Sequence, residues 1–333
     1  SHGGGSGWSS RDLPGDYRAL WQSPAGDAWA VGLGGVMAHW DGASWNVITP
    51  PPPAWGVEPA KAIWANTPSD AWAASNGAVS LDFQHWNGST WTKSSISAGD
   101  ATYAFVNQLW GSAPDDVWAV GSAGDQTVAR ILHYDGTKWS VAYDRSSTDK
   151  SSFDGVWGTS KSNVWFAGDA PNTPKSAILV HWDGHAMKQV SVPGPTDGEL
   201  VALGGTSKDD VWLSGNVNLQ ATIRHYDGAS WSVAYTGQAG FITSIYAATP
   251  DDAWAVGIEG GALHWNGTTW SKPATKLPRD IGYLWGSSGS DIWGGGLFGA
   301  VLHYDGSAWS PLQVTNASVV GVAGTGPNDV WLL

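Results

Sequence analysis

The sequence contains no cysteine among its 333 residues, so it can form no disulfide and offers no thiolate to a metal ion. Charged residues are also scarce, at 14%, and the formal net charge is −13. An acidic chain repels phosphate backbones and anionic lipid. No apolar run reaches the roughly 18 residues that a membrane-spanning helix needs. The composition therefore argues against nucleic acid as a partner and against a membrane span.

Tryptophan and glycine are abundant instead, with 25 Trp, 45 Gly and 18 Pro. Aromatic residues suit pleated strands and glycine suits tight turns, so the composition favours an all-β fold. Low charge with many Ser, Thr, Asn and Trp residues is typical of exported bacterial proteins. We expect a secreted, periplasmic or cell-surface protein, in which the polar start SHGGGSG follows a removed signal or is an engineered end.

One motif, DAWAVG at residues 27–32, returns in variants such as DVWAVG and DIWGGG along the whole chain. A self-similar unit of about 40 residues is the signature of a repeat architecture. Its tryptophans, 38 to 47 residues apart, are Trp29, Trp72, Trp118, Trp165, Trp212, Trp254, Trp293 and Trp331.

Two spacings inside the unit stay fixed while the total period varies. A short apolar run such as NQLW ends eight residues before each of these tryptophans, and a histidine stands six residues before a closing aromatic, as in His133 to Trp139. Met187 takes the closing place in the fourth unit. The histidines are His39, His85, His133, His181, His225, His264 and His303.

Each unit predicts four antiparallel strands, for example NQLW, VWAVG, ILHY and KWSV, separated by an APDD turn, a variable loop and an Asp-Gly turn. Asp-Gly between β-rich segments is a strong signal for a two-residue type I′ hairpin. Four strands per repeat predict a β-propeller blade. We expect blades at about 17–48, 60–94, 106–142, 153–191, 200–235, 242–272 and 281–312.

The two ends of the chain predict an eighth blade, shared by about 318–333 and 1–10. The C-terminal segment supplies two strands, and HGGGSGWSS aligns with HYDGSAWSP. Pairing of the ends would leave no open sheet edge. The sequence thus predicts one all-β domain over 1–333, an eight-bladed propeller, with seven blades as the alternative if the ends do not pair.

The DVWAVG and HYDGxxW elements resemble the repeat of tectonin-type propellers over the whole chain. The D-G-x-x-W element is also similar to the Asp-box turn of sialidase-like propellers, although Asp135 precedes Trp139 by one residue fewer than that box has. The tectonin resemblance implies glycan binding in shallow sites at blade edges or between blades. It carries over no individual ligand residue.

The repeated residues themselves favour a structural role. Outer strands of neighbouring blades diverge, so the repeated imidazoles cannot converge within the roughly 2 Å that a shared metal requires. We expect each histidine to hydrogen-bond backbone or a turn aspartate, and the repeated tryptophans to pack between blades. Aspartate pairs at 115–116, 209–210 and 251–252 are expected to cap turns, with calcium as the alternative and no other cofactor.

Function is expected where the units differ. The longest variable segments, at 50–61, 95–107, 121–130, 143–154 and 168–177, fall at the end of the blades opposite the tight turns, and such loops commonly carry binding. Aromatic faces beside short polar groups suit sugar rings, although the aromatics could instead cover loop bases. The candidate ligand-binding residues are Trp55, Tyr103, Phe105, Asp125, Arg130, Asp144, Arg145, Asp154, Asp169 and Lys175.

The leading hypothesis is an exported, monomeric, non-enzymatic propeller that binds a glycan. A scaffold for protein partners in the cell envelope is the first alternative. A polysaccharide lyase or glycoside hydrolase is the second, although no G-x-S-x-G, H-E-x-x-H or phosphate-loop pattern is present.

Overall fold

The computed structural model describes most of the chain. The described residues are 2–4, 7–9, 13–23, 26–48, 60–75, 80–97, 104–124, 126–146, 151–170, 176–195, 198–217, 220–259, 261–273, 277 and 280–333. They form β-strands and two short 3₁₀ turns, and none of them forms a helix that could cross a membrane. The chain divides into two compact units, residues 12–190 and residues 1–11 with 191–333.

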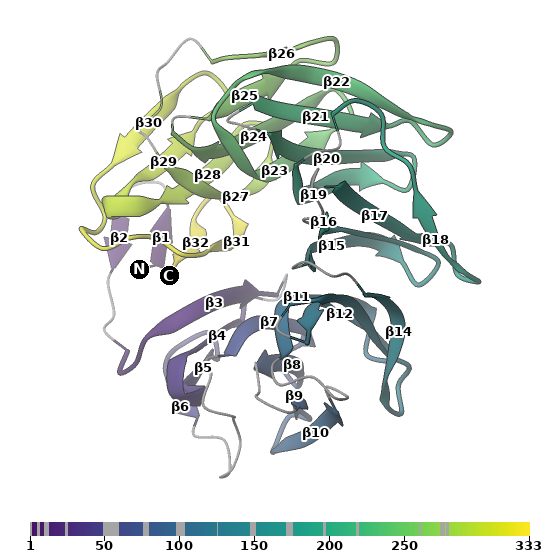
Figure 1. The fold of residues 1–333 in the computed structure, drawn as a ribbon. Coiled ribbons are helices and arrows are strands. Elements are labelled where there is room, and N and C mark those ends of the chain that lie inside the picture. The colour runs from purple at the N-terminus through teal and green to yellow at the C-terminus, as the bar shows by residue number, and fades with distance from the viewer. Residues whose placement is uncertain are drawn as a thin grey trace. The chain divides into compact units, whose positions relative to one another are not determined.

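Residues 12–190 contain four antiparallel sheets, each made of four consecutive strands (Figure 1). Blade 1 comprises β3 (Tyr17–Gln22), β4 (Ala28–Gly32), β5 (Met37–Trp40) and β6 (Trp45–Ile48), with the 3₁₀ turn η1 (Leu33–Gly35). Blade 2 comprises β7 (Ala60–Thr67), β8 (Asp70–Ser75), β9 (Ser80–Trp86) and β10 (Trp91–Ser97). Blade 3 comprises β11 (Ala104–Ala113), β12 (Asp116–Ala123), β13 (Val128–Tyr134) and β14 (Trp139–Ser146). Blade 4 comprises β15 (Ser152–Ser160), β16 (Asn163–Ala170), β17 (Ser176–Trp182) and β18 (Met187–Val190).

The other unit contains three more blades of the same kind. Blade 5 comprises β19 (Glu199–Ser207), β20 (Asp210–Val217), β21 (Gln220–Tyr226) and β22 (Trp231–Gln238). Blade 6 comprises β23 (Phe241–Thr249), β24 (Asp252–Ile258), β25 (Ala262–Trp265) and β26 (Trp270–Ser271). Blade 7 comprises β27 (Ile281–Ser288), β28 (Asp291–Gly296), β29 (Val301–Tyr304) and β30 (Trp309–Leu312), with the 3₁₀ turn η2 (Leu297–Gly299).

The two ends of the chain form a separate, smaller sheet in this unit, in the order β2-β1-β32-β31. Its strands, β1 (His2–Gly4), β2 (Gly7–Ser9), β31 (Val322–Gly326) and β32 (Asp329–Leu332), have only three to five residues. The pairing of the ends is present, but β1 meets β32 at two positions only. The prediction of eight blades is corrected: the described residues form seven four-stranded blades, each of consecutive strands, and the strands from the two ends of the chain form a separate small sheet.

The Asp-Gly hairpin lies where the sequence predicts it, but the predicted two-residue type I′ turn is wrong. In blade 3 the strands end at Tyr134 and resume at Trp139, so the loop has four residues. Only Gly136 has a positive φ, of 88°. Asp135 Oδ1 accepts hydrogen bonds from the backbone N–H groups of Thr137 and Lys138, both at 2.9 Å. This side-chain acceptor holds the turn without a second residue of positive φ.

Glycines on the first strands explain how neighbouring blades pack. A Cβ on Gly111 of blade 3 would lie 2.6 Å from the Trp64 ring of blade 2, so the indole lies directly against the glycine backbone. The same relation links consecutive sheets elsewhere in each unit, in the pairs Gly158 with Trp110, Gly286 with Tyr246 and Gly324 with Trp285. In these four pairs, the aromatic residue that ends an NQLW-like run packs on a glycine of the next sheet.

Strand direction gives every blade two different ends. The tight turn between the first and second strands and the Asp-Gly or Asn-Gly turn lie at one end. The connection between the second and third strands, and the connection to the next blade, lie at the other, which we call the loop end. The loop end is where the blades differ from one another.

Candidate functional site

The repeated histidine is part of a hydrogen-bonded frame inside each blade. In blade 3, His133 Nε2 lies 2.8 Å from Asp116 Oδ1, and its ring stacks on Trp118 with the centroids 3.9 Å apart. The Trp118 indole N–H also donates to Asp116, at 3.1 Å, and the Ser112 hydroxyl donates to the other carboxylate oxygen at 2.5 Å. Burial disfavours the charged form of Asp116, but the hydrogen bonds from His133 and Ser112 outweigh burial and keep the pKa of this carboxyl below its ordinary value.

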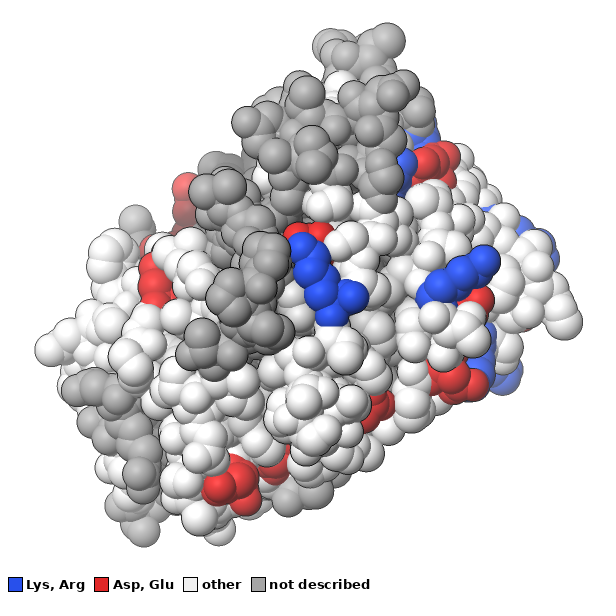
Figure 2. Space-filling view, turned by 90° about the horizontal axis from the view of Figure 1, so that it is seen from below, with Lys and Arg blue, Asp and Glu red and all other residues white. Residues whose placement is uncertain are grey.

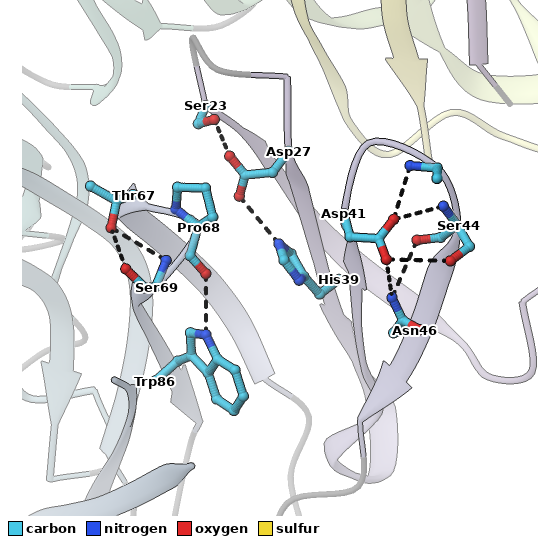
Figure 3. Close-up of polar contacts among 11 residues, drawn as sticks. Ser23, Asp27, His39, Asp41, Ser44, Asn46, Thr67, Pro68, Ser69 and Trp86 are labelled. Carbon is cyan, nitrogen blue, oxygen red and sulfur yellow. Dashed lines mark hydrogen bonds and ion pairs between the residues drawn. The ribbon is translucent and has the colours of Figure 1, made fainter. Parts of the chain in front are cut away.

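The same contact recurs in the other blades, and Figure 3 shows it in blade 1 between His39 and Asp27. There the Asp27 carboxylate lies between the imidazole and the Ser23 hydroxyl, which donates to it. A serine nucleophile needs the imidazole next to its hydroxyl, so this order of groups does not activate Ser23. The further His–Asp contacts are His85–Asp70, His225–Asp210, His264–Asp252 and His303–Asp291, at 2.7 to 2.8 Å.

Blade 4 departs from this pattern because Asn163 replaces the aspartate. His181 Nε2 lies 2.8 Å from Asn163 Oδ1, and the ring stacks on Trp165. Burial lowers the pKa of His181, opposed by the charge of Asp183 and assisted by that of Lys188. The frame therefore tolerates a neutral partner, which indicates a role in holding strands together.

The frame tryptophans are all buried, with at most 3% of their surface exposed. Trp29, Trp72, Trp118, Trp212 and Trp254 each contact aromatic rings of the following blade, as Trp72 does with Tyr134 and Trp139. In the part of the chain that the structure describes, no three His, Asp or Glu side chains gather closely enough to hold a metal ion. In the aspartate pair at 115–116, Asp115 binds Lys161 at 2.6 Å while Asp116 binds His133, so the two carboxylates are engaged separately.

Four of the ten candidate ligand-binding residues, Trp55, Tyr103, Asp125 and Lys175, lie outside the described residues. Arg130 and Asp144 lie directly opposite each other on β13 and β14. Arg130 Nε and Nη2 each donate to one carboxylate oxygen of Asp144 at 2.8 Å. This bidentate pair neutralises both charges. Arg145 is the next residue along β14, so its side chain points to the other face of the sheet.

The remaining candidates lie at the loop ends of blades 3 and 4. Lys61 Nζ lies 5.9 Å from the centre of the Phe105 ring, a cation–π contact between blades 2 and 3. Asn107 Nδ2 donates to Asp154 Oδ1 at 2.8 Å and so connects blades 3 and 4. Asp169 pairs with Ser152 across the first two strands of blade 4. The structure thus places the described candidates in several separate contacts and does not gather them into one pocket.

A groove of about 300 Å³ lies between blades 2 and 3. Its walls are the third and fourth strands of blade 2 and the Asp-Gly hairpin of blade 3. Aromatic rings, hydroxyl groups and two lysines line it, among them Trp72, Tyr134, Trp139, Thr92, Lys93 and Lys138. Lys93 is held by Asp82 at 2.8 Å.

A second surface, which the sequence did not single out, lies at the loop end of blade 7. Phe298 is 85% exposed and Leu297 is 44% exposed. They form one wall of a shallow groove of about 570 Å³, which continues over Val301, Pro311 and Leu312. Phe298 also has a φ of 56°, in the left-handed region that residues with a Cβ rarely adopt.

Backbone hydrogen bonds hold this turn in place. Gly296 N–H donates to Ala300 O at 2.9 Å, and Ala300 N–H donates to Leu297 O at 3.1 Å. The Phe298 N–H donates to the Ser318 hydroxyl at 3.2 Å. The exposed ring is therefore carried by a fixed turn, with little backbone entropy left to lose when a partner binds.

Blades 1 and 6 contain the same turn with other residues at its centre. Blade 1 repeats both bonds, from Gly32 to Val36 and from Val36 to Leu33, and has Gly34 at the position of Phe298, with a φ of 66°. Blade 6 has Glu259 at this position, with a φ of 58°. Aligning GLGG at 32–35 with GLFG at 296–299 shows that Phe298 stands where blade 1 has a glycine. The exposure of the ring and the φ of the residue cannot be read from the sequence.

Asp280 joins the turns of blades 6 and 7. Its Oδ1 accepts a hydrogen bond from Glu259 N–H at 2.9 Å, and its backbone carbonyl accepts one from Leu297 N–H at 3.0 Å. Asp280 has a positive φ as well, of 65°. Among the described residues, Glu259, Asp280 and Phe298 are three of the four non-glycine residues with positive φ. We call Ile258, Glu259, Asp280, Leu297 and Phe298 the blade 6–7 surface.

Comparison with known proteins identifies the fold. No protein-family model and no curated protein matches the sequence. Among solved structures, the Dos1 propeller matches with a TM-score of 0.69 and 10% identity over 95% of this chain and 91% of that chain. Sqt1 of Chaetomium thermophilum, bound to the N-terminus of ribosomal protein L10, matches with a TM-score of 0.65 and 12% identity over 94% of each chain. YCF48 bound to D1 peptide matches with a TM-score of 0.57 and 14% identity over 89% of this chain and 99% of that chain.

These likenesses show that the chain is a β-propeller. They do not decide its activity, because propellers of similar shape serve unrelated functions. Function has to be argued from the surface chemistry of this chain.

Proposed function

We propose that the chain is a propeller that binds a segment of another protein on the blade 6–7 surface. The observation that carries this proposal is Phe298, an aromatic ring that is 85% exposed and sits at a positive φ on a fixed turn. Aromatic residues, phenylalanine among them, are enriched at protein interfaces relative to the rest of the surface.

Two free-energy terms disfavour phenylalanine at this position in the free protein. A residue with a Cβ in the left-handed region costs about 1–2 kcal/mol relative to its ordinary conformations. An exposed ring also leaves apolar surface in water, and its burial by a partner would contribute about 1.5–3 kcal/mol. The turn does not require phenylalanine, because Gly34 makes the same turn in blade 1. The fold does not require an aromatic ring at this position, whereas binding of a partner that covers the ring would account for it.

The propeller neighbours support binding of a peptide segment. The Sqt1 structure holds the N-terminus of a ribosomal protein, and the YCF48 structure holds a D1 peptide. Both cover 89% or more of this chain with the same architecture. The fold is thus compatible with peptide binding, and the exposed ring gives this chain a place for it.

The test is selection of peptides from a displayed library on the whole chain, followed by binding measurements with variants. Phe298→Gly adopts the sequence of the blade 1 turn, so it removes the ring and keeps the backbone. Val141→Ser is the matched control, because Val141 is also a large exposed apolar residue, at 44%, and lies on the last strand of blade 3. We expect F298G to lose the selected peptides and V141S to keep them. Equal capture by F298G would overturn the proposal.

Glycan binding in the groove between blades 2 and 3 is the second candidate. Its support is the combination of aromatic rings with the hydroxyls of Thr92 and Thr137 and the ammonium of Lys138, which suits a sugar with an apolar face and polar rim. A glycan array with the native chain and K138A tests it. Binding that K138A weakens would favour this candidate, and no binding at millimolar sugar would remove it.

A further inference from the structure

We infer that the blade 6–7 surface selects a cationic segment, in which an apolar side chain is flanked by Lys or Arg. This inference rests on the proposed function and adds the chemistry of the partner. Its basis is that Asp280 lines the groove bordered by Phe298 and also accepts a hydrogen bond from the Glu259 backbone, so two acidic residues adjoin the turn that carries the exposed ring.

Glu259 occupies in blade 6 the position that Phe298 occupies in blade 7. It is exposed and has a φ of 58°, so it too adopts a backbone conformation that glycine would adopt without strain. Its carboxylate makes no hydrogen bond or ion pair within the described part of the chain. A charged residue on a strained, fixed turn without an internal partner is suited to a group supplied from outside.

Asp280 links the turn that carries Glu259 to the apolar wall. It contacts the Glu259 backbone through its side chain and the Leu297 backbone through its carbonyl, so one residue spans both turns. Asp280 also lines the groove that Leu297 and Phe298 border. Asp280 and the exposed ring therefore line one groove, and the exposed turn that carries Glu259 adjoins it through Asp280.

The residue of blade 1 that is equivalent to Asp280 is Asp16, and its charge is neutralised by a nearby arginine. Asp16 accepts Leu33 N–H through its carbonyl, as Asp280 accepts Leu297 N–H, but Arg18 Nη2 lies 2.7 Å from its carboxylate. Asp280 has no such cation among the described residues and bonds a backbone N–H instead. The Asp280 carboxylate thus keeps a charge that, at the equivalent position of blade 1, an arginine neutralises.

Charge complementarity decides between possible occupants. Two acidic residues near an apolar ring attract a segment that supplies both a cation and an apolar group. The net charge of −13 adds long-range attraction for such a segment and repulsion for anionic lipid. On the one face drawn in Figure 2, the Lys and Arg residues stand singly, several beside an Asp or Glu, and the described residues form no continuous basic patch.

The test uses the peptides selected on the whole native chain. We expect Lys or Arg next to an apolar residue to be enriched among them, and binding to weaken as salt rises. Glu259→Gln and Asp280→Asn each remove one charge, and we expect about a threefold to tenfold loss of affinity and a weaker salt dependence. Glu259→Lys should lose more, because it repels the same cation. Arg279 adjoins Asp280 in sequence but lies outside the described residues, so R279Q is measured in parallel and should not weaken binding.

Asp251→Asn is the matched control for charge, because Asp251 lies in the same blade at the opposite end and its loss changes the net charge equally. Two results together would overturn this inference and leave the proposed function standing. The selected peptides would depend on Phe298 but show no enrichment in Lys or Arg, and E259Q, D280N and D251N would bind them with the same affinity. Failure of the native chain to select any peptide would overturn the proposed function itself. Capture of neutral glycans, of a second copy of the chain or of lipid vesicles through Phe298 would each overturn the inference.

Discussion

Phe298 and Gly34 occupy the same position of the same backbone turn in blades 7 and 1, with φ angles of 56° and 66°. Both turns are closed by the same pair of backbone hydrogen bonds. The two blades therefore provide an internal comparison. In blade 1 a glycine adopts the turn without strain, and in blade 7 the same turn carries an exposed aromatic ring.

Replacement of Phe298 by glycine is expected to leave the stability of the fold intact. Relief of the left-handed strain favours the variant, while the greater freedom of glycine in the unfolded chain disfavours it, so the free energy of unfolding should change by less than about 1 kcal/mol. Denaturant unfolding of both proteins measures this change. A loss above about 2 kcal/mol would show that the ring packs within the fold and is not a free anchor.

Alanine substitutions of the two adjacent aspartates of the blade 3 turn should have very different effects on the free energy of unfolding. Asp116→Ala leaves His133, Trp118 and Ser112 without their buried acceptor, so the free energy of unfolding should fall by about 2–4 kcal/mol. Asp115→Ala removes an exposed ion pair with Lys161 and should leave the unfolding midpoint unchanged. Equal effects of the two substitutions in denaturant unfolding would contradict the structural role of the His–Asp contact.

The pKa of His181 should respond to its partner. Asn163→Asp supplies a carboxylate at Nε2 and should raise the His181 pKa, which burial holds below the ordinary value in the native chain. A depressed folded pKa removes stability as the pH falls below about 6.5, whereas a raised one adds stability there. The variant should therefore gain stability relative to the native chain at low pH. NMR titration of the imidazole measures the pKa, and an unchanged value would show that residue 163 does not face this ring.

Packing between blades 2 and 3 can be tested at Gly111. Gly111→Ala places a methyl group against the Trp64 ring and should reduce the free energy of unfolding by about 1–3 kcal/mol. Gly282→Ala is the control, because a Cβ there meets no atom within 4 Å and lies on the first strand of blade 7. Stability that is unchanged in both variants would contradict the proposed contact of glycine with the aromatic ring.

The sequence predicted the blades well because their constraints are local. The spacing from Asp116 to Trp118 and from His133 to Trp139 follows from strand pairing and a hairpin of fixed length. The type of hairpin was missed, because the side chain of Asp135 replaces the second positive φ. The blade count was also wrong, since the repeat persists in the terminal segments although their strands form a separate small sheet.

The candidate site was predicted less well, because it depends on contacts between strands. Arg130 and Asp144 are of residue types that often bind ligands. Strand register places them opposite each other, where they form an ion pair. The sequence did not single out Phe298, because function was expected in the longest loops and the blade 7 turn is short. Its exposure and its φ are properties of the folded turn and not of residue composition.

Calorimetric titration of one selected peptide into the native chain and into F298G tests whether Phe298 anchors a protein segment. We expect F298G to bind the peptide at least about tenfold more weakly, as for an anchor residue at the centre of an interface. Equal affinity of the native chain and F298G for that peptide would contradict it.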